Sequence, residues 1–289
     1  SEATIKNYTN NFRLLLDFKP DLELSDITES TMSEFFKYLD ERERQVGRKK
    51  IVRRIMNSSR QTIVGKLKTF FTWLVDRKYI GVNPLDEVRI SVKYTDFRAF
   101  TDKELDKIFL SVSRDIAWGN EFIKKRNIAF IMLLTYTGVR RNELLHIKNS
   151  DFDWEEKTIQ IRVETFKSKM NRKVAIQEIL IPHLQAYKFE RREMKCEYFW
   201  ISSNMDKRFT EHGLKHLTKK ISETAKINCH VHRFRHTFAV KLYEQSKDIL
   251  LVQRALGHTS IKMTLSYLRS KTDDEYIQQL LKLTAREFV

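Results

Sequence analysis

Glycine and proline, the residues that most often interrupt regular backbone structure, occur only 7 and 3 times among the 289 residues of this chain. Apolar side chains recur instead at helical spacing. The clearest stretch is 59–75, where one continuous apolar stripe is formed by Ile63, Val64, Leu67, Phe70, Phe71, Leu74 and Val75. Two further helices are predicted from Ile5, Tyr8, Phe12, Leu15 and Leu16 and, after residues 28–30, from Phe35, Phe36 and Leu39. We therefore expect a mainly α-helical chain.

The length of the chain fits two domains better than one. The helix at 59–75 is followed by Asn83-Pro84, where the backbone must leave helical geometry. A polar, basic segment without strong periodicity comes next and is typical of a linker. A new helix is predicted at Thr101, because Glu104 completes a capping box three residues later. The expected organisation is a helical domain over 1–86, a linker over 87–100, a second domain over 101–272 and a C-terminal helix over 273–289.

The second domain is predicted to be mixed, because two short segments alternate as strands do. The first is 152–163, and its buried side is expected to consist of Trp154, Ile159, Ile161 and Val163. A turn rich in Lys, Ser and Asn follows at 166–172, and residues 174–181 are predicted to return as the partner strand. The expected fold class is mainly α with a small β-sheet, with an α+β second domain after a helical first domain.

The charge of the chain favours a polyanionic partner. Lys and Arg together number 54 against 38 Asp and Glu, which leaves +16 at pH 7. Residues 44–75 contain no acid at all, and we expect this stretch to contact DNA phosphates from a helix start. Its basic residues are Arg44, Arg48, Lys49, Lys50, Arg53, Arg54, Arg60, Lys66 and Lys68. A solvated charged face is the alternative interpretation of the same pattern.

The sequence also indicates the cellular compartment in which the protein is expected. Only Cys196 and Cys229 are present, so no disulfide framework is implied and a reducing compartment is expected. The longest apolar run, 128–134, is too short to span a bilayer, and no secretory signal opens the chain. We expect a cytoplasmic, nucleoid-associated protein without membrane contact. The chain begins at Ser1 without an initiator methionine, which leaves room for an upstream domain.

Five residues with phosphodiester chemistry stand in a fixed order in the second domain. They are Arg140 in TGVRRNEL, His232 and Arg235 in HRFRH, His258 in LGH, and Tyr267. The arginine fork matches two phosphate oxygens, histidine moves protons near neutral pH, and tyrosine can form a covalent intermediate. Two arginines and a histidine can supply the charge stabilisation that other nucleases obtain from Mg²⁺, so no metal and no ATP are expected.

Two neighbouring residues are expected to support this set. Arg140 follows a Gly-containing turn and is predicted to lie at a helix N-terminus, where Glu143, one turn later, would orient its guanidinium. His232 and Arg235 are predicted to share one helix face. His236 is expected to support the same helix by hydrogen bonding.

The motifs TGVRRNELL, HRFRHTFA, LGHTS and TLSYL resemble the signature boxes of the tyrosine recombinase (phage integrase) family, in order and in spacing. The first domain resembles the family only in being small, basic and helical. The resemblance implies that Tyr267 is the nucleophile, that Arg140 and Arg235 hold the scissile phosphate, that His232 assists as acid and base, and that His258 donates to a phosphate oxygen. The chain departs from the commoner family form at Ala175, where proline is frequent, and at Phe234, where leucine is usual.

The resemblance further implies a lysine, on the turn of a strand hairpin, that protonates the leaving 5′ oxygen. Aligning the basic-then-apolar strand places this role at Lys167, and Lys169, on the same turn, is the alternative. The implied product is a 3′-phosphotyrosyl linkage with a free 5′-hydroxyl. The implied partners are a double-stranded recombination site, further copies of the chain that form a dimer and tetramer on DNA through the 273–289 helix, and accessory DNA-bending proteins.

Several functions stay open on the sequence alone. The favoured interpretation is the integrase of a mobile genetic element, because an upstream arm-binding domain would fit the missing start. A Xer-type chromosome-dimer resolvase and a type IB topoisomerase-like enzyme share the same chemistry. A non-catalytic DNA-binding accessory protein would belong to another class. A zinc site at Cys229 and His230 is disfavoured, because no second Cys/His pair has a finger-like spacing.

Overall fold

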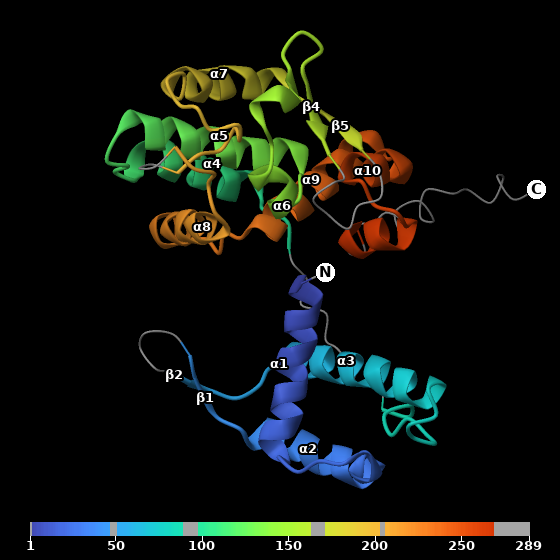
Figure 1. Ribbon diagram of the computed structural model, residues 1–289. Coiled ribbons are helices and arrows are strands. Elements are labelled where there is room, and N and C mark those ends of the chain that lie inside the picture. Colours follow the sequence, from blue (N-terminus) through green and yellow to red (C-terminus); the bar gives the residue numbers. More distant parts are fainter. Residues whose placement is uncertain (1, 47–50, 89–97, 163–170, 203–205, 269–289) are drawn as a thin grey trace, which may run out of the picture. The chain divides into compact units, whose positions relative to one another are not determined.

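The computed structural model describes residues 2–46, 51–88, 98–162, 171–202 and 206–268 (Figure 1). The chain divides into two compact units, Ser1–Thr95 and Asp96–Val289. Each has its own apolar core, and each is described by itself. Within the described ranges no helix is both long and apolar enough to cross a membrane.

The first unit consists of three helices and a short hairpin. Its elements are α1 (Glu2–Phe18), the 3₁₀ turn η1 (Leu24–Asp26), α2 (Glu29–Glu41), β1 (Arg44–Val46), β2 (Ile51–Arg53) and α3 (Asn57–Asp76). The three predicted helices are present, and α2 begins where the Thr28 side chain accepts from the backbone N–H of Thr31. The core contains Leu15, Met32, Phe35, Phe36, Leu39, Ile63, Val64, Leu67, Phe71, Leu74 and Leu85.

Two details of the first unit differ from the prediction. Ile5 and Leu16 are 68% and 49% exposed, so α1 packs through a narrower stripe than its spacing suggested. The basic stretch does not begin as a helix start: an antiparallel hairpin precedes α3, with Arg44 opposite Arg53. Period-two alternation is weak in these short strands, so nothing in the sequence pattern distinguished them from a loop.

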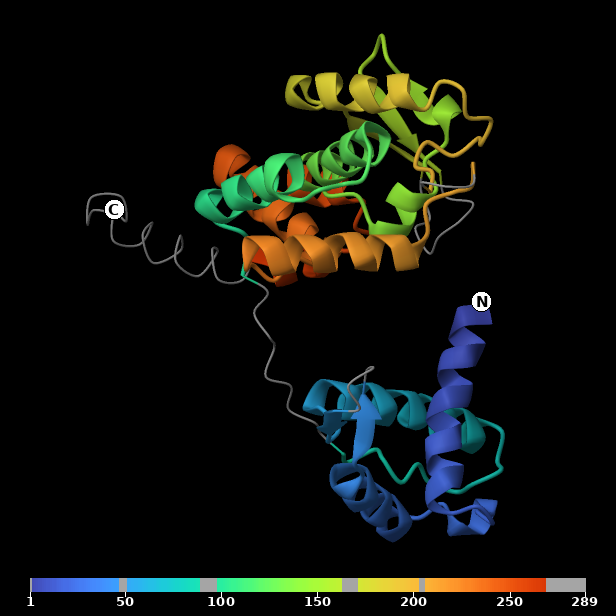
Figure 2. The same cartoon turned by 90° about the vertical axis from the view of Figure 1, so that its left-hand side faces the viewer.

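The second unit places helices around a three-stranded sheet. Its helices are α4 (Asp102–Leu110), α5 (Glu121–Thr137), α6 (Arg141–Leu145), α7 (Ile181–Glu190), α8 (Glu211–Ala225), α9 (Val231–Ser246) and α10 (Ile249–Leu256), and 261–268 are also helical. Shorter turns are η2 (Ser111–Asp115), η3 (Asn149–Asp151) and η4 (Glu178–Leu180). In both ribbon views α7 and α8 lie on opposite sides of α5 (Figures 1 and 2).

The predicted small antiparallel sheet is present, with corrected bounds. It consists of β3 (Phe152–Asp153), β4 (Thr158–Ile161) and β5 (Arg172–Ala175), in that order. The last strand starts and ends earlier than 174–181, since the end of that range is occupied by η4 and by the start of α7. Pro182 lies in the first turn of α7, a position that suits its fixed φ and missing N–H. Ile159 and Ile161 are buried as expected, whereas Trp154 is half-buried beyond β3 and stacks on Phe152. Val163 lies outside the described residues.

Helix α5 is the centre of the second core and determines where Arg140 lies. It is capped by Asn120, whose Oδ1 accepts from the N–H of Ile123, and it is buried over most of its length. It ends at Gly138, which has φ +59° and lies against the Phe238 ring. Arg140 follows two residues later, so the end of a rigid, buried helix fixes the start of the site.

Replacing Gly138 with alanine is expected to lower the free energy of unfolding by about 2–5 kcal/mol. A left-handed φ costs a side chain about 1–2 kcal/mol, and the added methyl group would overlap the Phe238 ring, which adds an overpacking cost of about 1–3 kcal/mol. Denaturant unfolding measures the difference. Gly65→Ala is the control: Gly65 lies within α3 with open space around it, so this change should stabilise by about 0.5–1 kcal/mol. Unfolding of Gly138→Ala at the wild-type denaturant concentration would contradict the expectation.

Candidate active site

Arg140 lies at the N-terminus of α6, as its position after the glycine turn predicted. Its backbone N–H donates to Glu143 Oε2 at 2.8 Å, and its Nη1 donates to Glu143 Oε1 at 2.9 Å. Its Nη2 donates to the carbonyl oxygen of Gly257 at 2.9 Å. The Arg140 side chain is 30% exposed, so the guanidinium is held by the protein and still reaches solvent.

Glu143 is a buried carboxylate shared by two arginines. Arg172, the first residue of β5, donates from Nη1 to Oε1 at 2.9 Å and from Nη2 to Oε2 at 2.8 Å. Burial alone would raise the pKa of Glu143, but the hydrogen bonds and charge of Arg172, together with the bonds from Arg140, lower this pKa to about 2. Arg172 was not among the predicted site residues, because a pair between residues so distant in sequence has no local pattern.

Arg235 is the most deeply buried of the predicted site residues, at 2% exposed. From α9 its Nη1 donates to the Gly138 carbonyl at 2.6 Å, and its Nη2 donates to the Leu256 carbonyl at 2.8 Å and to His258 Nε2 at 2.9 Å. Burial lowers the pKa of Arg235 to about 10, with a further contribution from the Arg140 charge. The guanidinium therefore stays charged at neutral pH and connects the ends of α5 and α10.

His258 is held as a neutral ring. Its Nε2 accepts from Arg235, so the proton lies on Nδ1, which donates to Thr264 Oγ1 at 2.9 Å. Burial, then the charges of Arg235, Arg140 and Arg172, lower the pKa of His258 from 6.5 to about 4. Both ring nitrogens are occupied in this arrangement, so donation to a phosphate oxygen requires Nε2 to exchange Arg235 for a proton and the phosphate.

We expect His258 to make folding stability depend on pH between about 7 and 4. The unfolded chain protonates this ring below its usual pKa near 6.5, whereas the folded chain resists until about 4, so stability is lost as pH falls through this window. The loss should reach roughly 3 kcal/mol. In His258→Asn, the free energy of unfolding should therefore fall by roughly 3 kcal/mol less than in wild type when urea unfolding is repeated from pH 7 to pH 4.

Other titrating groups do not obscure this comparison, for two reasons. The pKa values of His146, His183, His230 and His232 are also lowered, but these rings are common to both proteins and cancel in the difference. The stabilisation by Glu143 is lost only as pH falls from its usual pKa near 4.5 to about 2, which is mostly below the window. Equal slopes for the two proteins would show that His258 does not resist protonation.

His232 and His236 extend from the same helix as Arg235. His232, in the first turn of α9, is exposed, and desolvation followed by the charges of Arg141 and Arg235 lowers its pKa. This favours a neutral ring that can accept a proton. His236 is buried, and its ring stacks on Tyr267 with centroids 5.5 Å apart.

Tyr267 lies in the helical segment 261–268 and is half-buried. Its ring centroid is 5.5 Å from the rings of both His236 and His258, and its hydroxyl lies within electrostatic reach of the Arg235 guanidinium. It packs on a small apolar cluster of Ala239, Val252 and Leu256. The structure thus gathers Arg140, Arg235, His258 and Tyr267 around the ends of α5 and α10. Lys167 and its alternative Lys169 lie outside the described residues, as does the helix predicted at 273–289.

The basic residues of the first unit have varied surroundings. Arg54 is exposed. Arg60 pairs with Asp40 at 2.8 Å, Lys66 lies 4.4 Å from the centroid of the Tyr8 ring, and Lys68 donates to the Asp86 carbonyl. Arg44 and Arg53 belong to the hairpin, and Arg48, Lys49 and Lys50 lie outside the described residues. Acidic residues are absent from 44–75, but Asp40 and Asp86 of neighbouring segments thus pair with two of its basic side chains.

Cys229 and His230 have structural contacts. Burial raises the pKa of the Cys229 thiol to about 11, and its backbone N–H donates to Ser222 Oγ. The His230 side chain accepts from the N–H of Arg233 and so caps α9. Both residues therefore help to fix the start of the helix that carries His232 and Arg235.

Comparison with known proteins gives a consistent result over both units. Residues 99–274 match the Phage integrase family, and residues 1–92 match the Phage integrase SAM-like domain. The tyrosine recombinase XerC of Oceanobacillus iheyensis is 28% identical over 281 residues, which cover 94% of this chain and 87% of the relative.

Two solved structures share the fold. A XerH site-specific recombinase bound to palindromic difH substrate, a post-cleavage complex, has a TM-score of 0.77 at 22% identity and covers 97% of this chain and 80% of the other. The Tn1549 transposon integrase in complex with transposon right-end DNA has a TM-score of 0.73 at 18% identity, with 99% and 95% covered. The second unit is a tyrosine-recombinase catalytic domain. The chain belongs to the phage integrase family, with a SAM-like domain ahead of the catalytic one.

Proposed function

We propose that the protein is a site-specific DNA recombinase that cleaves and rejoins strands through Tyr267. The observation that supports this most strongly is the environment of that tyrosine, whose ring contacts His236 and His258 and which lies within electrostatic reach of the buried Arg235. A phosphate that reaches Arg235 and Arg140 would meet two charged forks next to a nucleophile. Such preorganised donors stabilise the charge that develops on the phosphate in the transition state.

The proposed reaction is a pair of transesterifications. The Tyr267 oxygen attacks phosphorus, its proton passes to His232, and the bond from phosphorus to the 5′ oxygen breaks as Lys167 gives that oxygen a proton. The product is a 3′-phosphotyrosine and a free 5′-hydroxyl. Because a phosphodiester is exchanged for a phosphodiester, a 5′-hydroxyl of another strand can reverse the step without ATP.

We further propose that the SAM-like domain and the catalytic domain both bind double-stranded DNA, joined by the linker at 87–100. The net charge of +16 supports this, and both solved relatives named above are described as DNA complexes. The 273–289 helix is proposed to dock on a neighbouring copy, so that two and then four copies assemble on paired sites. Accessory DNA-bending proteins would help to bring these sites together.

The biological role that we propose is integration of a mobile genetic element, and the likeness to the transposon integrase supports it. A Xer-type chromosome-dimer resolvase is the second candidate, favoured by the similarity to XerC over most of both chains. Trapping covalent complexes in the native host and sequencing the attached DNA distinguishes the two. Adducts at the ends of an element support integration, whereas a single chromosomal site supports resolution.

A nicked suicide duplex that carries the trapped site tests the chemistry. The expected result is a covalent protein–DNA adduct that forms without metal or ATP. Absence of an adduct would favour the alternative function, a non-catalytic DNA-binding accessory protein. Relaxation of supercoiled DNA without paired sites, and with no recombinant product from paired ones, would instead indicate a type IB topoisomerase-like enzyme.

A further inference from the structure

Arg172 is the inner partner of the carboxylate that holds Arg140. Its side chain is only 11% exposed, and its two Nη atoms bind the two oxygens of Glu143, whose side chain is 1% exposed. Arg140 reaches the same carboxylate from outside, through its backbone N–H and one Nη atom. Glu143 therefore makes its two-pronged side-chain pair with Arg172 and holds only one Nη atom of Arg140, whose other Nη atom donates to the Gly257 carbonyl.

Arg172 also lies behind the turn that carries His258. A β-carbon on Gly257 would be 3.0 Å from Arg172 Cδ and 3.1 Å from Nε, so the guanidinium stem packs directly on this glycine. Gly257 has φ +62°, its carbonyl accepts from Arg140, and His258 follows it. One side chain thus contacts the partner of Arg140 and the residue that precedes His258.

The electrostatic balance explains why the inner arginine is needed. A buried carboxylate that loses its counter-charge attracts whatever cation remains in reach. Without Arg172, Arg140 would be the one guanidinium among the described residues still bound to Glu143, and it would be drawn inward and away from solvent. The donors that are to meet a phosphate would then be used on Glu143 instead.

We propose that Arg172 is a positioning residue for strand cleavage: it satisfies Glu143 and supports Gly257, so that Arg140 and His258 face the scissile phosphate. Arg172 acts through these neighbours, since both of its Nη atoms are used on Glu143. It is the first residue of β5, so the ion pair with Glu143 joins this strand to α6. This inference rests on the proposed function, in which Arg140 and His258 bind the phosphate.

Single-turnover cleavage of the suicide duplex by three variants tests the proposal. Arg172→Met should cleave about 100-fold more slowly than wild type, because small misplacements of catalytic groups have effects of this size. Its affinity for uncleaved DNA should stay within about 3-fold, since binding is spread over many phosphate contacts. Arg172→Lys should recover part of the rate, because it keeps the charge without the fork.

The third variant separates positioning from a general weakening of the fold. Arg172→Met combined with Glu143→Gln removes both charges of the pair, so no unbalanced carboxylate remains to draw Arg140 inward. We expect this double variant to cleave no more slowly than Arg172→Met alone. A double variant that cleaves much more slowly than Arg172→Met alone would contradict a coupling through Arg140.

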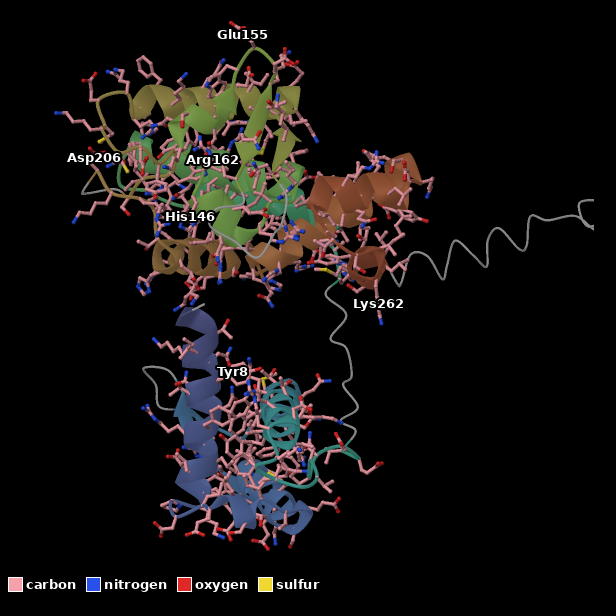
Figure 3. All side chains as sticks on the ribbon, turned by 45° about the vertical axis from the view of Figure 1, so that its right-hand side comes forward. Tyr8, His146, Glu155, Arg162, Asp206 and Lys262 are labelled. Carbon is pink, nitrogen blue, oxygen red and sulfur yellow. The ribbon has the colours of Figure 1, made fainter. Side chains whose placement is uncertain are left out.

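Arg162→Met is the matched control. Arg162, labelled in Figure 3, directly follows β4 and binds the buried carboxylate of Asp151 through Nε at 2.6 Å. It therefore loses the same kind of ion pair beside the same sheet, at the other end of the segment that contains Lys167. Within the described ranges its hydrogen bonds go to Asp151 and Ser150, neither of which is a proposed catalytic residue. Its cleavage rate should stay within about 3-fold of wild type at temperatures where it is folded.

The outcomes are distinguishable. Cleavage by Arg172→Met at the wild-type rate overturns the inference. An equal loss of cleavage rate in Arg162→Met also overturns it, as does a loss of DNA affinity as large as the loss of rate in Arg172→Met. The inference is also overturned if the fraction of unfolded Arg172→Met, measured in thermal melts, fully accounts for its lower cleavage rate. Failure of the wild-type protein to form any adduct contradicts the proposed function itself.

Discussion

Tyr267→Phe is expected to abolish the covalent adduct with a suicide duplex, because phenylalanine keeps the ring and removes the attacking oxygen. Loss of a nucleophile in enzymes with covalent intermediates costs on the order of a million-fold in rate. DNA affinity should stay near the wild-type value. Stability should change by no more than about 1 kcal/mol, since the change removes one hydroxyl of a half-buried side chain and keeps the contacts of the ring with His236 and His258.

Tyr243→Phe is the control for this variant, because Tyr243 packs on the same apolar cluster. It should form the adduct at close to the wild-type rate. Adduct formation is measured as protein–DNA complexes that survive denaturing electrophoresis. An undiminished adduct from Tyr267→Phe would mean that another residue attacks the phosphate.

Arg235→Lys is expected to reduce cleavage by about a hundred- to a thousand-fold, the usual cost of losing a preorganised donor to a charged transition state. A single ammonium group keeps the charge but cannot reproduce the planar fork that reaches Gly138, Leu256 and His258. Stability should also fall by about 1–3 kcal/mol, because buried acceptors lose their donors. Single-turnover cleavage and denaturant unfolding measure the two effects separately.

Arg126→Lys provides the matched comparison. Arg126 is 6% exposed, its pKa is lowered by burial to about 10, as that of Arg235 is, and it donates to the Ile201 carbonyl and to Asn127. Its replacement should lower stability to a similar degree and leave cleavage nearly unchanged. If both variants lost cleavage equally while folded, the effect of Arg235 would be structural.

The sequence predicted those parts of the fold that depend on local pattern. The apolar stripe at 59–75 predicted α3, and the capping box at Thr101 and Glu104 predicted the start of α4, where both bonds of the box are present. The sequence did not predict which of the regularly spaced apolar residues would be covered: Ile5 and Leu16 recur at helical spacing in α1, yet they are 68% and 49% exposed. Burial depends on neighbouring elements, which spacing along one helix does not report.

The candidate site likewise contains residues that the sequence motifs predict and one residue, Arg172, that they do not. The order of the motifs predicted Arg140, Arg235, His258 and Tyr267, and the structure brings these four together. Arg172 was missed because its importance comes from a contact with Glu143, which is distant in sequence and in a different element. A buried basic residue at the start of a strand has no signature until its partner is known. The roles of all these residues in catalysis stay predictions until the variants are tested.

The carbonyl groups that accept from Arg140 and Arg235 have a common origin. Gly138 ends α5, and Leu256 and Gly257 end α10, so the two guanidinium groups lie at the negative ends of two helix dipoles. Each dipole end carries roughly half a negative charge, which offsets part of the repulsion between the two cations. The helix ends thus supply part of the negative charge that balances the two arginines, so Arg140 and Arg235 can lie close together before a DNA phosphate binds.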